Sequence, residues 1–120
     1  APGLPANAVK SALASSGVYA LEPVRLSYLN EALRLDAAAA RRNSPAFFAR
    51  KGAAPLALAV GAGETAEFRR QQRHFAAALA QAGAAAETLE VPNRHHFDVI
   101  HDLAAPGTRL HALMRARLGV

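Results

Sequence analysis

The sequence predicts an α/β fold with three layers, α/β/α, built on about three parallel strands. Short apolar runs that end at glycine or proline alternate with segments whose apolar residues recur at helical spacing. Strands that alternate with helices favour a parallel sheet with right-handed crossovers. Three strands leave open edges in such a sheet, so we expect residues 1–120 to be a single partial domain, one end of a larger open sheet.

Three apolar segments predict the strands. Residues 9–16 are mostly small and apolar and end at Gly17. Residues 55–60 form a continuous apolar run before a glycine, which is the pattern of a strand covered on both faces. Residues 86–91 form the third strand and end before a proline.

One long helix and several short ones are expected between and after these strands. Residues 65–82 place Phe68, Phe75 and Leu79 on one face, the pattern of a helix packed against a sheet. Asp36 is the expected cap of a short helix, and Asp98 is expected to cap another. The short helices are predicted over residues 24–35, 36–42, 97–103 and 108–118.

Composition narrows the classes of function. The chain has no cysteine, which excludes a disulfide framework and a thiolate zinc site and agrees with a cytoplasmic protein. No apolar run approaches the roughly 18–20 residues of a membrane span, so we expect no membrane attachment. The net charge of +5 is not gathered into a long basic block, and we expect no nucleic-acid partner. His95, His96 and His101 lack the spacing of a metal site, and no metal is expected.

Two loops carry the residues that suggest chemistry. The helix over residues 65–82 makes two strands neighbours, so the loops that follow them, residues 61–64 and 92–98, lie side by side. Glu64 and His96 then come within hydrogen-bonding reach, and a carboxylate on one ring nitrogen leaves the other nitrogen free as a base. The residues alone leave a second reading open, in which Glu64 favours a helix N-terminus and His96 is a surface turn residue.

The sequence around these loops is similar to a known family. Residues 60–71 read Val-Gly-Ala-Gly-Glu-Thr-Ala-Glu-Phe-Arg-Arg-Gln, and residues 92–98 read Pro-Asn-Arg-His-His-Phe-Asp. With residues 16–30, they resemble the C-terminal part of α/β-hydrolases, most of all the arylformamidase (kynurenine formamidase-like) esterase group. The resemblance covers nearly the whole chain. It implies a catalytic triad in the chain order nucleophile, acid, histidine, with Glu64 as the acid and His96 as the general base.

The resemblance also implies a reaction, and the departures from it matter. The implied activity is hydrolysis of a small-molecule ester or aryl formamide, such as N-formylkynurenine, without a cofactor. The chain has no Gly-x-Ser-x-Gly elbow and no His-Gly-Gly stretch for an oxyanion hole, both of which lie upstream in the family. Ala20 stands where the family often has Asp. We therefore expect a truncated C-terminal segment of a serine hydrolase that is inactive alone. Val18 and Tyr19 follow the first strand on the same side and are candidate substrate-binding residues.

Two alternatives stay open. Gly61-x-Gly63 before a helix also fits a dinucleotide-binding fingerprint, although Glu64 would bring a negative charge into the phosphate nest. In the second alternative, the chain is a non-catalytic interaction fragment. With an open edge at residues 9–16, it would form a homo-oligomer or associate with the missing N-terminal half of a hydrolase.

Overall fold

A three-stranded parallel sheet is the centre of the molecule. The computed structural model describes residues 3–84 and 86–120. The strands are β1 (Ala12–Ser15), β2 (Leu56–Gly61) and β3 (Ala86–Val91), and they lie in the order β1-β2-β3. Ala12 pairs with Leu56, and Leu56 pairs with Ala86. The predicted parallel sheet is therefore confirmed.

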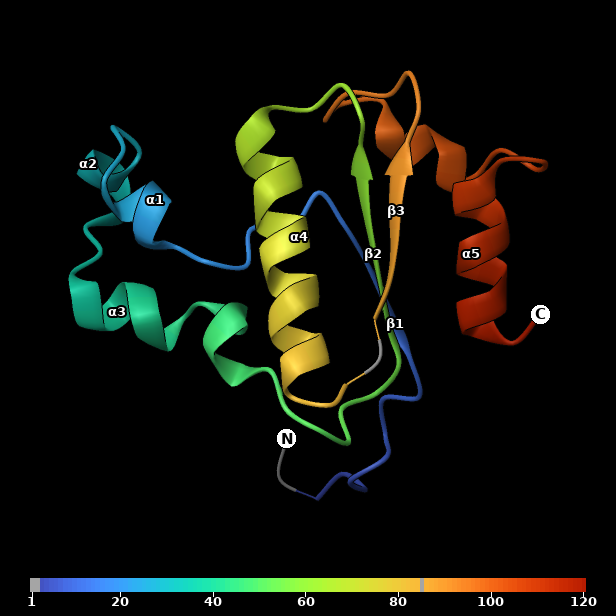
Figure 1. Ribbon diagram of the computed structural model, residues 1–120, viewed down its shortest axis with the longest axis horizontal. Coiled ribbons are helices and arrows are strands. Elements are labelled where there is room, and N and C mark those ends of the chain that lie inside the picture. Colours follow the sequence, from blue (N-terminus) through green and yellow to red (C-terminus); the bar gives the residue numbers. More distant parts are fainter. Residues whose placement is uncertain (1–2, 85) are drawn as a thin grey trace.

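Helices cover both faces of this sheet (Figure 1). On one side lies α4 (Ala66–Gln81), and on the other lie α5 (Arg109–Leu118) and the 3₁₀ helix η2 (Val99–Leu103). The helix α4 connects β2 to β3, as predicted. Of the three side chains expected on its sheet-facing side, Phe68 is not part of the cluster on the sheet, which leaves Phe75 and Leu79. Both of these side chains are buried against the sheet. The result is a three-layer α/β/α arrangement.

The central strand β2 sends alternate residues to the two layers. Leu58 packs with Phe75 and Leu79 of α4. Ala57 and Ala59 face the opposite cluster, which includes Leu110 and Leu113 of α5. Five of the six residues of β2 are buried, as expected for a parallel strand covered on both faces.

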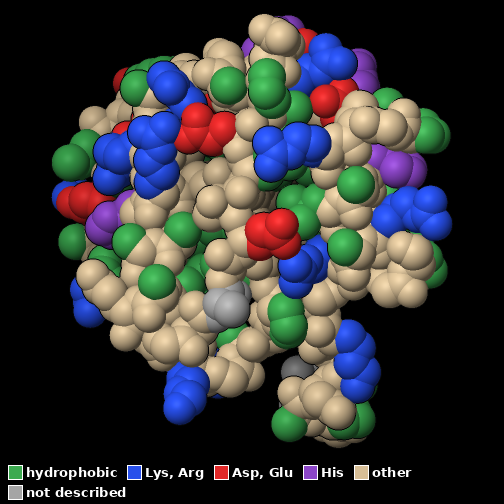
Figure 2. All heavy atoms as spheres, turned by 45° about the vertical axis from the view of Figure 1, so that its right-hand side comes forward, with side chains coloured by type: hydrophobic (Ala, Val, Ile, Leu, Met, Phe, Trp, Pro, Cys, Tyr) green, Lys and Arg blue, Asp and Glu red, His purple; other side chains and the backbone are tan. Residues whose placement is uncertain are grey.

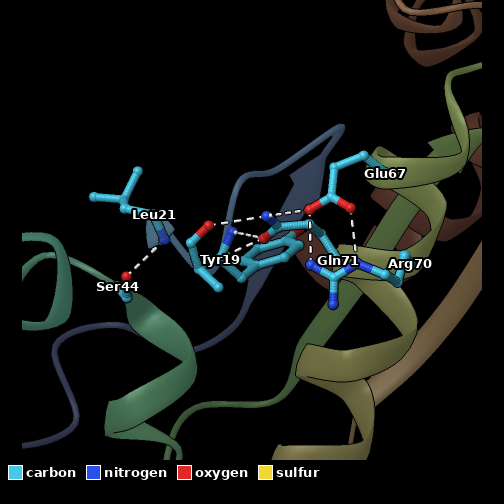
Figure 3. A network of polar contacts seen from close by, with 7 residues as sticks. Tyr19, Leu21, Ser44, Glu67, Arg70 and Gln71 are labelled. Carbon is cyan, nitrogen blue, oxygen red and sulfur yellow. Dashed lines mark hydrogen bonds and ion pairs between the residues drawn. The ribbon is translucent and has the colours of Figure 1, made fainter. Parts of the chain in front are cut away.

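A helical arm connects β1 to β2 and lies beside α4, away from the sheet (Figure 1). It contains α1 (Glu22–Arg25), α2 (Asn30–Leu33), α3 (Ala37–Arg42) and the 3₁₀ helix η1 (Pro45–Phe48). Asp36 caps α3 as predicted, because its carboxylate accepts a hydrogen bond of 2.7 Å from the backbone N–H of Ala39. The Ser44 hydroxyl accepts another, of 2.8 Å, from the N–H of Leu21, which ties the start of the arm to its end (Figure 3).

The structure differs from the sequence expectations at several helix and strand ends. For the segment predicted over residues 24–35, it has two short helices, and the first begins at Glu22. The first strand is shorter than residues 9–16, and Val9 is exposed ahead of it. The helix expected over residues 97–103 is the 3₁₀ helix η2, and Asp98 does not cap it. The Asp98 carboxylate instead accepts a hydrogen bond of 2.6 Å from the N–H of His95, three residues earlier. It therefore closes the turn before the helix.

The surface carries dispersed charge. On the face shown in Figure 2, basic side chains are spread over the surface with acidic side chains among them. Several are paired, as in Arg117–Glu87 at 2.7 Å and Arg73–Glu90 at 2.6 Å. Within residues 3–84 and 86–120, no helix has the length and apolar character that crossing a membrane requires.

Candidate functional site

Glu64 and His96 meet at the carboxyl ends of β2 and β3. Glu64 Oε1 lies 2.8 Å from His96 Nδ1, so the contact expected from the crossover between the two strands is present. The Glu64 side chain is completely buried, whereas 43% of the His96 side chain is exposed. The carboxylate therefore lies beneath the imidazole, and the ring faces the surface.

The second carboxylate oxygen of Glu64 has its own donors. The Ser16 hydroxyl donates to Oε2 at 2.6 Å, and the N–H of Gly61 donates to the same oxygen at 2.6 Å. Burial alone would raise the pKa of Glu64, but the hydrogen bonds from Ser16, Gly61 and His96 outweigh it and lower the pKa below its usual value. Glu64 is thus held as a carboxylate.

Ser16 is a member of this arrangement that the sequence did not reveal. It follows β1, and its backbone has a φ of 52°, in the left-handed region that non-glycine residues seldom adopt. This conformation accompanies the contact of its hydroxyl with Glu64. The one available signal was its place at the carboxyl end of a strand, on the same edge as Glu64 and His96.

The loops that carry Glu64 and His96 are joined through their backbones. The N–H of Gly63 donates to the carbonyl oxygen of Arg94 at 2.9 Å. A Cβ atom on Gly61 would lie 2.4 Å from the same oxygen, so only glycine permits this approach. The guanidinium of Arg94 also binds the buried carboxylate of Asp102 in η2, with Nε 2.9 Å from Oδ1. These contacts fix the His96 loop on two sides.

Aromatic side chains hold the imidazole of His96. The Phe68 ring stacks on it with a centroid distance of 4.6 Å and an interplanar angle of 27°. Phe97 contacts it edge-on at 5.4 Å. No residue in the described part of the chain makes a hydrogen bond to His96 Nε2. If Nδ1 carries the proton that Glu64 accepts, Nε2 is the free basic nitrogen.

Val18 and Tyr19, the candidate substrate-binding residues, lie in different environments. Val18 is 39% exposed and lines a cavity of about 260 Å³ that also contacts Phe68. Tyr19 is 6% exposed and stacks on Phe75 at 4.5 Å, so it lies in the core and does not line this cavity. Its ring passes so close to Gly17 that a Cβ there would lie 2.3 Å from it. Substrate binding by Tyr19 stays a prediction, and its ring lies in the core.

The glycine motif does not form an open phosphate cradle. The N–H of Gly61 is already bound to Glu64, and Gly61 and Gly63 both face the Arg94 carbonyl group. A pyrophosphate would meet the buried carboxylate of Glu64 there. The two glycines therefore allow the loops that carry Glu64 and His96 to pack closely together. In the portion of the chain that the structure describes, no three His, Cys, Asp or Glu side chains lie close enough to hold a metal ion.

The chain is similar to two curated proteins over most of its length. It is 30% identical to a kynurenine formamidase of Danio rerio over 116 residues and 32% identical to one of Salmo salar over 117 residues. Each match covers 92% of this chain and 40% of the relative, so the chain spans about two fifths of their length. No protein-family model matches the chain.

Solved structures show the same fold. A candidate thioesterase of Silicibacter sp. TM1040 superposes with a TM-score of 0.76 and 28% identity, over 86% of this chain and 37% of that one. Esterase 2 of Thermogutta terrifontis superposes with a TM-score of 0.60 and 21% identity, over 98% of this chain and 42% of that one. The chain therefore has the fold of one part of such hydrolases.

Proposed function

We propose that this chain, a C-terminal part of an α/β-hydrolase similar to the kynurenine formamidases, supplies the acid and the general base of a serine hydrolase. The observation that carries the proposal is the contact of 2.8 Å between Glu64 Oε1 and His96 Nδ1. It has the geometry in which a carboxylate orients an imidazole and stabilises its protonated form. The serine nucleophile and the oxyanion hole come from polypeptide outside these 120 residues.

The proposed reaction passes through an acyl-serine intermediate. His96 Nε2 accepts the proton of the serine hydroxyl while the serine oxygen attacks the carbonyl carbon of the substrate. The same nitrogen then gives the proton to the leaving alcohol or amine as its bond to the carbonyl carbon breaks. Water, deprotonated in turn by His96, releases the acid and restores the serine. No cofactor takes part.

The environment of Glu64 suits the role of the acid. An imidazolium next to a buried carboxylate is stabilised only if the carboxylate is ionised before the proton transfer. The donors Ser16 and Gly61 hold the charge on Glu64 Oε2 and leave Oε1 to His96. Glutamate in place of the commoner aspartate is accommodated because the side chain folds back onto the N–H of Gly61, three residues earlier.

Among the described residues, Ser16 is the serine whose hydroxyl bonds to the acid–base pair, and it is not the proposed nucleophile. Its hydroxyl proton is donated to Glu64 Oε2, on the far side of the carboxylate from His96. A nucleophile must instead approach His96 Nε2, at the exposed side of the ring. This supports a serine from outside the chain.

The substrates that we propose are esters and aryl formamides. N-Formylkynurenine is the candidate suggested by the name of the Danio rerio relative, and a short-chain aryl ester such as 4-nitrophenyl acetate is a convenient second substrate. In both, the aryl group is bonded to the nitrogen or oxygen that leaves the carbonyl carbon attacked by the serine.

The test is reconstitution of activity. The chain is assayed alone and together with the part of the Danio rerio kynurenine formamidase that lies outside the matched region. We expect no turnover by the chain alone and measurable turnover by the pair. His96→Gln and Glu64→Gln are expected to lower kcat by about 10⁴-fold or more, the order found when the acid of a triad is replaced by its amide. His95→Gln, at an exposed neighbouring histidine, is the matched control.

Two results would overturn the proposal. One is turnover by the chain alone that disappears when one of its own serines is replaced. The other is turnover by the pair that is the same with His96→Gln as with the unchanged chain. The tautomer of His96, read from ¹⁵N chemical shifts of the chain alone, gives an independent check. In the uncharged ring, a proton on Nδ1 and none on Nε2 is expected.

We also propose that the open edge of the sheet along β1 is an association surface. In the described part of the chain, β1 is bonded to β2 on one side and to no strand on the other. A parallel strand from the remainder of a hydrolase, or from a second copy, would satisfy its open backbone groups. Light scattering after size exclusion tests this. We expect a homo-oligomer of the chain alone, and a stable dilute monomer would contradict self-association.

A further inference from the structure

A cavity of about 260 Å³ lies between the helical arm and the N-terminal half of α4. Its walls are mainly apolar side chains from both elements. Val18, Pro23, Val24 and Leu29 come from the arm and the segment that leads into it, and Phe68 comes from α4. These elements are distant in the sequence, so the cavity exists only in the folded chain.

Of the four polar side chains that border this cavity, Ser27, Glu67 and Gln71 have hydrogen-bond partners, and Thr65 makes no side-chain hydrogen bond to cap α4. Gln71 Oε1 accepts from the N–H groups of Tyr19 and Ala20, both at 2.8 Å, and its amide donates to Glu67 (Figure 3). Glu67 is paired with Arg70 at 2.7 Å, and the Ser27 hydroxyl donates to the carbonyl of Val24. A charged or strongly polar guest would find little compensation for its lost hydration here.

The cavity adjoins the candidate active site through Phe68. The Phe68 ring lines the cavity and also stacks on the imidazole of His96 at 4.6 Å. Thr65, another lining residue, directly follows Glu64 in the chain. Phe68 is therefore shared by the cavity and by the candidate general base.

The size of the cavity sets the class of guest. An apolar cavity of about 150 Å³ in another protein accepts benzene. At about 260 Å³, this cavity has room for a substituted aromatic ring. Its walls are held in place before any guest arrives, because Gln71 fixes the backbone next to Val18 with three hydrogen bonds.

We propose that this cavity binds the uncharged, ring-sized apolar group of the substrate, the aryl part of an aryl ester or aryl formamide. In this arrangement, the aryl group packs against Phe68 and Val18, and the carbonyl carbon lies past the edge of the Phe68 ring, towards His96. The inference rests on the proposed function for its account of the substrate. The binding itself does not require a nucleophile and is measurable on the chain as it is.

The experiment is a titration of the ¹⁵N-labelled chain with formanilide, the smallest aryl formamide. We expect saturable shifts in the amide signals of Val18, Val24 and Phe68. N-Methylformamide, which lacks the ring, is expected to shift them at least 10-fold less at equal concentration. Val24→Phe, which fills the cavity, should weaken formanilide binding at least 10-fold. Leu33→Phe, at an exposed position on α2 outside the cavity, is the control and should bind normally.

A folding check accompanies the filling variant. If thermal melting shows that Val24→Phe is unfolded, Val18→Phe replaces it, because Val18 is partly exposed and tolerates a larger side chain with less strain. Equal shifts with formanilide and N-methylformamide, or shifts confined to other regions, would overturn the inference. Formanilide binding that is lost as the protein concentration rises would also overturn the inference, because it would show that a second copy of the chain closes the cavity.

His96→Gln separates this inference from the proposed function. It should abolish turnover by the reconstituted hydrolase and leave formanilide binding unchanged. Loss of turnover without any formanilide binding to the chain would contradict the inference alone. Normal formanilide binding with retained turnover would contradict the proposed function alone.

Discussion

The backbone of Gly61 lies directly against the carbonyl group of Arg94. A Cβ atom at Gly61 would be 2.4 Å from that oxygen and 2.8 Å from the carbonyl carbon. These are backbone atoms of the loop that carries His96, so they cannot turn aside as a flexible side chain would. The relative placement of Glu64 and His96 therefore depends on the absence of a side chain at Gly61.

Gly61→Ala should destabilise the protein and displace the His96 loop. We expect a loss of about 1–3 kcal/mol in the free energy of unfolding, the usual cost of overpacking a rigid site. Gly63→Ala is the graded control, because its Cβ would lie 3.1 Å from the same oxygen and needs a smaller shift. Urea unfolding measures both. An equal effect of the two substitutions would contradict the close approach at Gly61.

Removing the Ser16 hydroxyl should weaken the hydrogen bonding of the Glu64 carboxylate on the side away from His96. Ser16→Gly suits the φ of 52° and deletes the 2.6 Å hydrogen bond to Glu64. We expect the pKa of Glu64 to rise towards its usual value, and a loss of about 1–3 kcal/mol in stability, as for hydrogen bonds to charged groups. The pKa is measured by carboxyl ¹³C shifts.

Ser15→Ala is the matched control for this substitution. The neighbouring Ser15 hydroxyl is buried and has no hydrogen-bond partner among the described residues. Its removal is expected to leave stability within about 0.5 kcal/mol of the unchanged chain or to raise it slightly. A larger loss at Ser15 than at Ser16 would show that the Ser16–Glu64 hydrogen bond contributes little.

Stability should depend on pH through Glu64. Its pKa is lower in the folded chain than the usual 4.5, so the unfolded chain binds the proton more readily. The stabilisation is complete well above pH 4.5 and is lost as the pH falls through the folded pKa. The stability difference between the unchanged chain and Glu64→Gln should therefore shrink on acidification.

The comparison isolates Glu64 because other carboxylates are shared. Glu22 and Glu67 also have lowered pKa values through Arg25 and Arg70, and their contributions cancel between the two proteins. Urea unfolding from about pH 3 to pH 7 gives the difference. A difference that does not change with pH would mean that the Glu64 carboxylate is not stabilised by its donors.

Gln71→Leu should loosen the segment between β1 and the helical arm. It removes the bonds to the backbone of Tyr19 and Ala20 and leaves buried N–H groups without partners. We expect a loss of about 2–4 kcal/mol and faster amide exchange at these residues. Gln72→Leu is the control, because Gln72 is equally buried but makes one bond, of 3.3 Å, to the carbonyl of Leu89. Similar losses for both would contradict the role of Gln71.

The sequence was sufficient to predict that Glu64 and His96 meet, and the reason is topological. Each follows a strand of a parallel sheet, and one crossover helix makes those strands neighbours. Apolar periodicity and glycine stops were enough to locate the strands and the helix. Side-chain detail was not needed for this prediction.

Ser16 and Tyr19 could not be assigned in the same way, because spacing does not encode the direction of a side chain in a loop. Ser16 reaches Glu64 from a left-handed backbone conformation that is rare outside glycine. Tyr19 turns into the core over Gly17 and packs on Phe75. Asp98 likewise binds the backbone of its own turn rather than the following helix.

Each of the three strands ends in one member of a single hydrogen-bonded chain, with Ser16 after β1, Glu64 after β2 and His96 after β3. A slip of β1 by one residue along β2 would move the Ser16 hydroxyl by about 3.3 Å and break its bond to Glu64. The ionisation of Glu64 and the tautomer of His96 are therefore sensitive to strand alignment. A polypeptide that docks on the open edge of β1 and shifts that strand would change the hydrogen bonding that orients an imidazole two strands away.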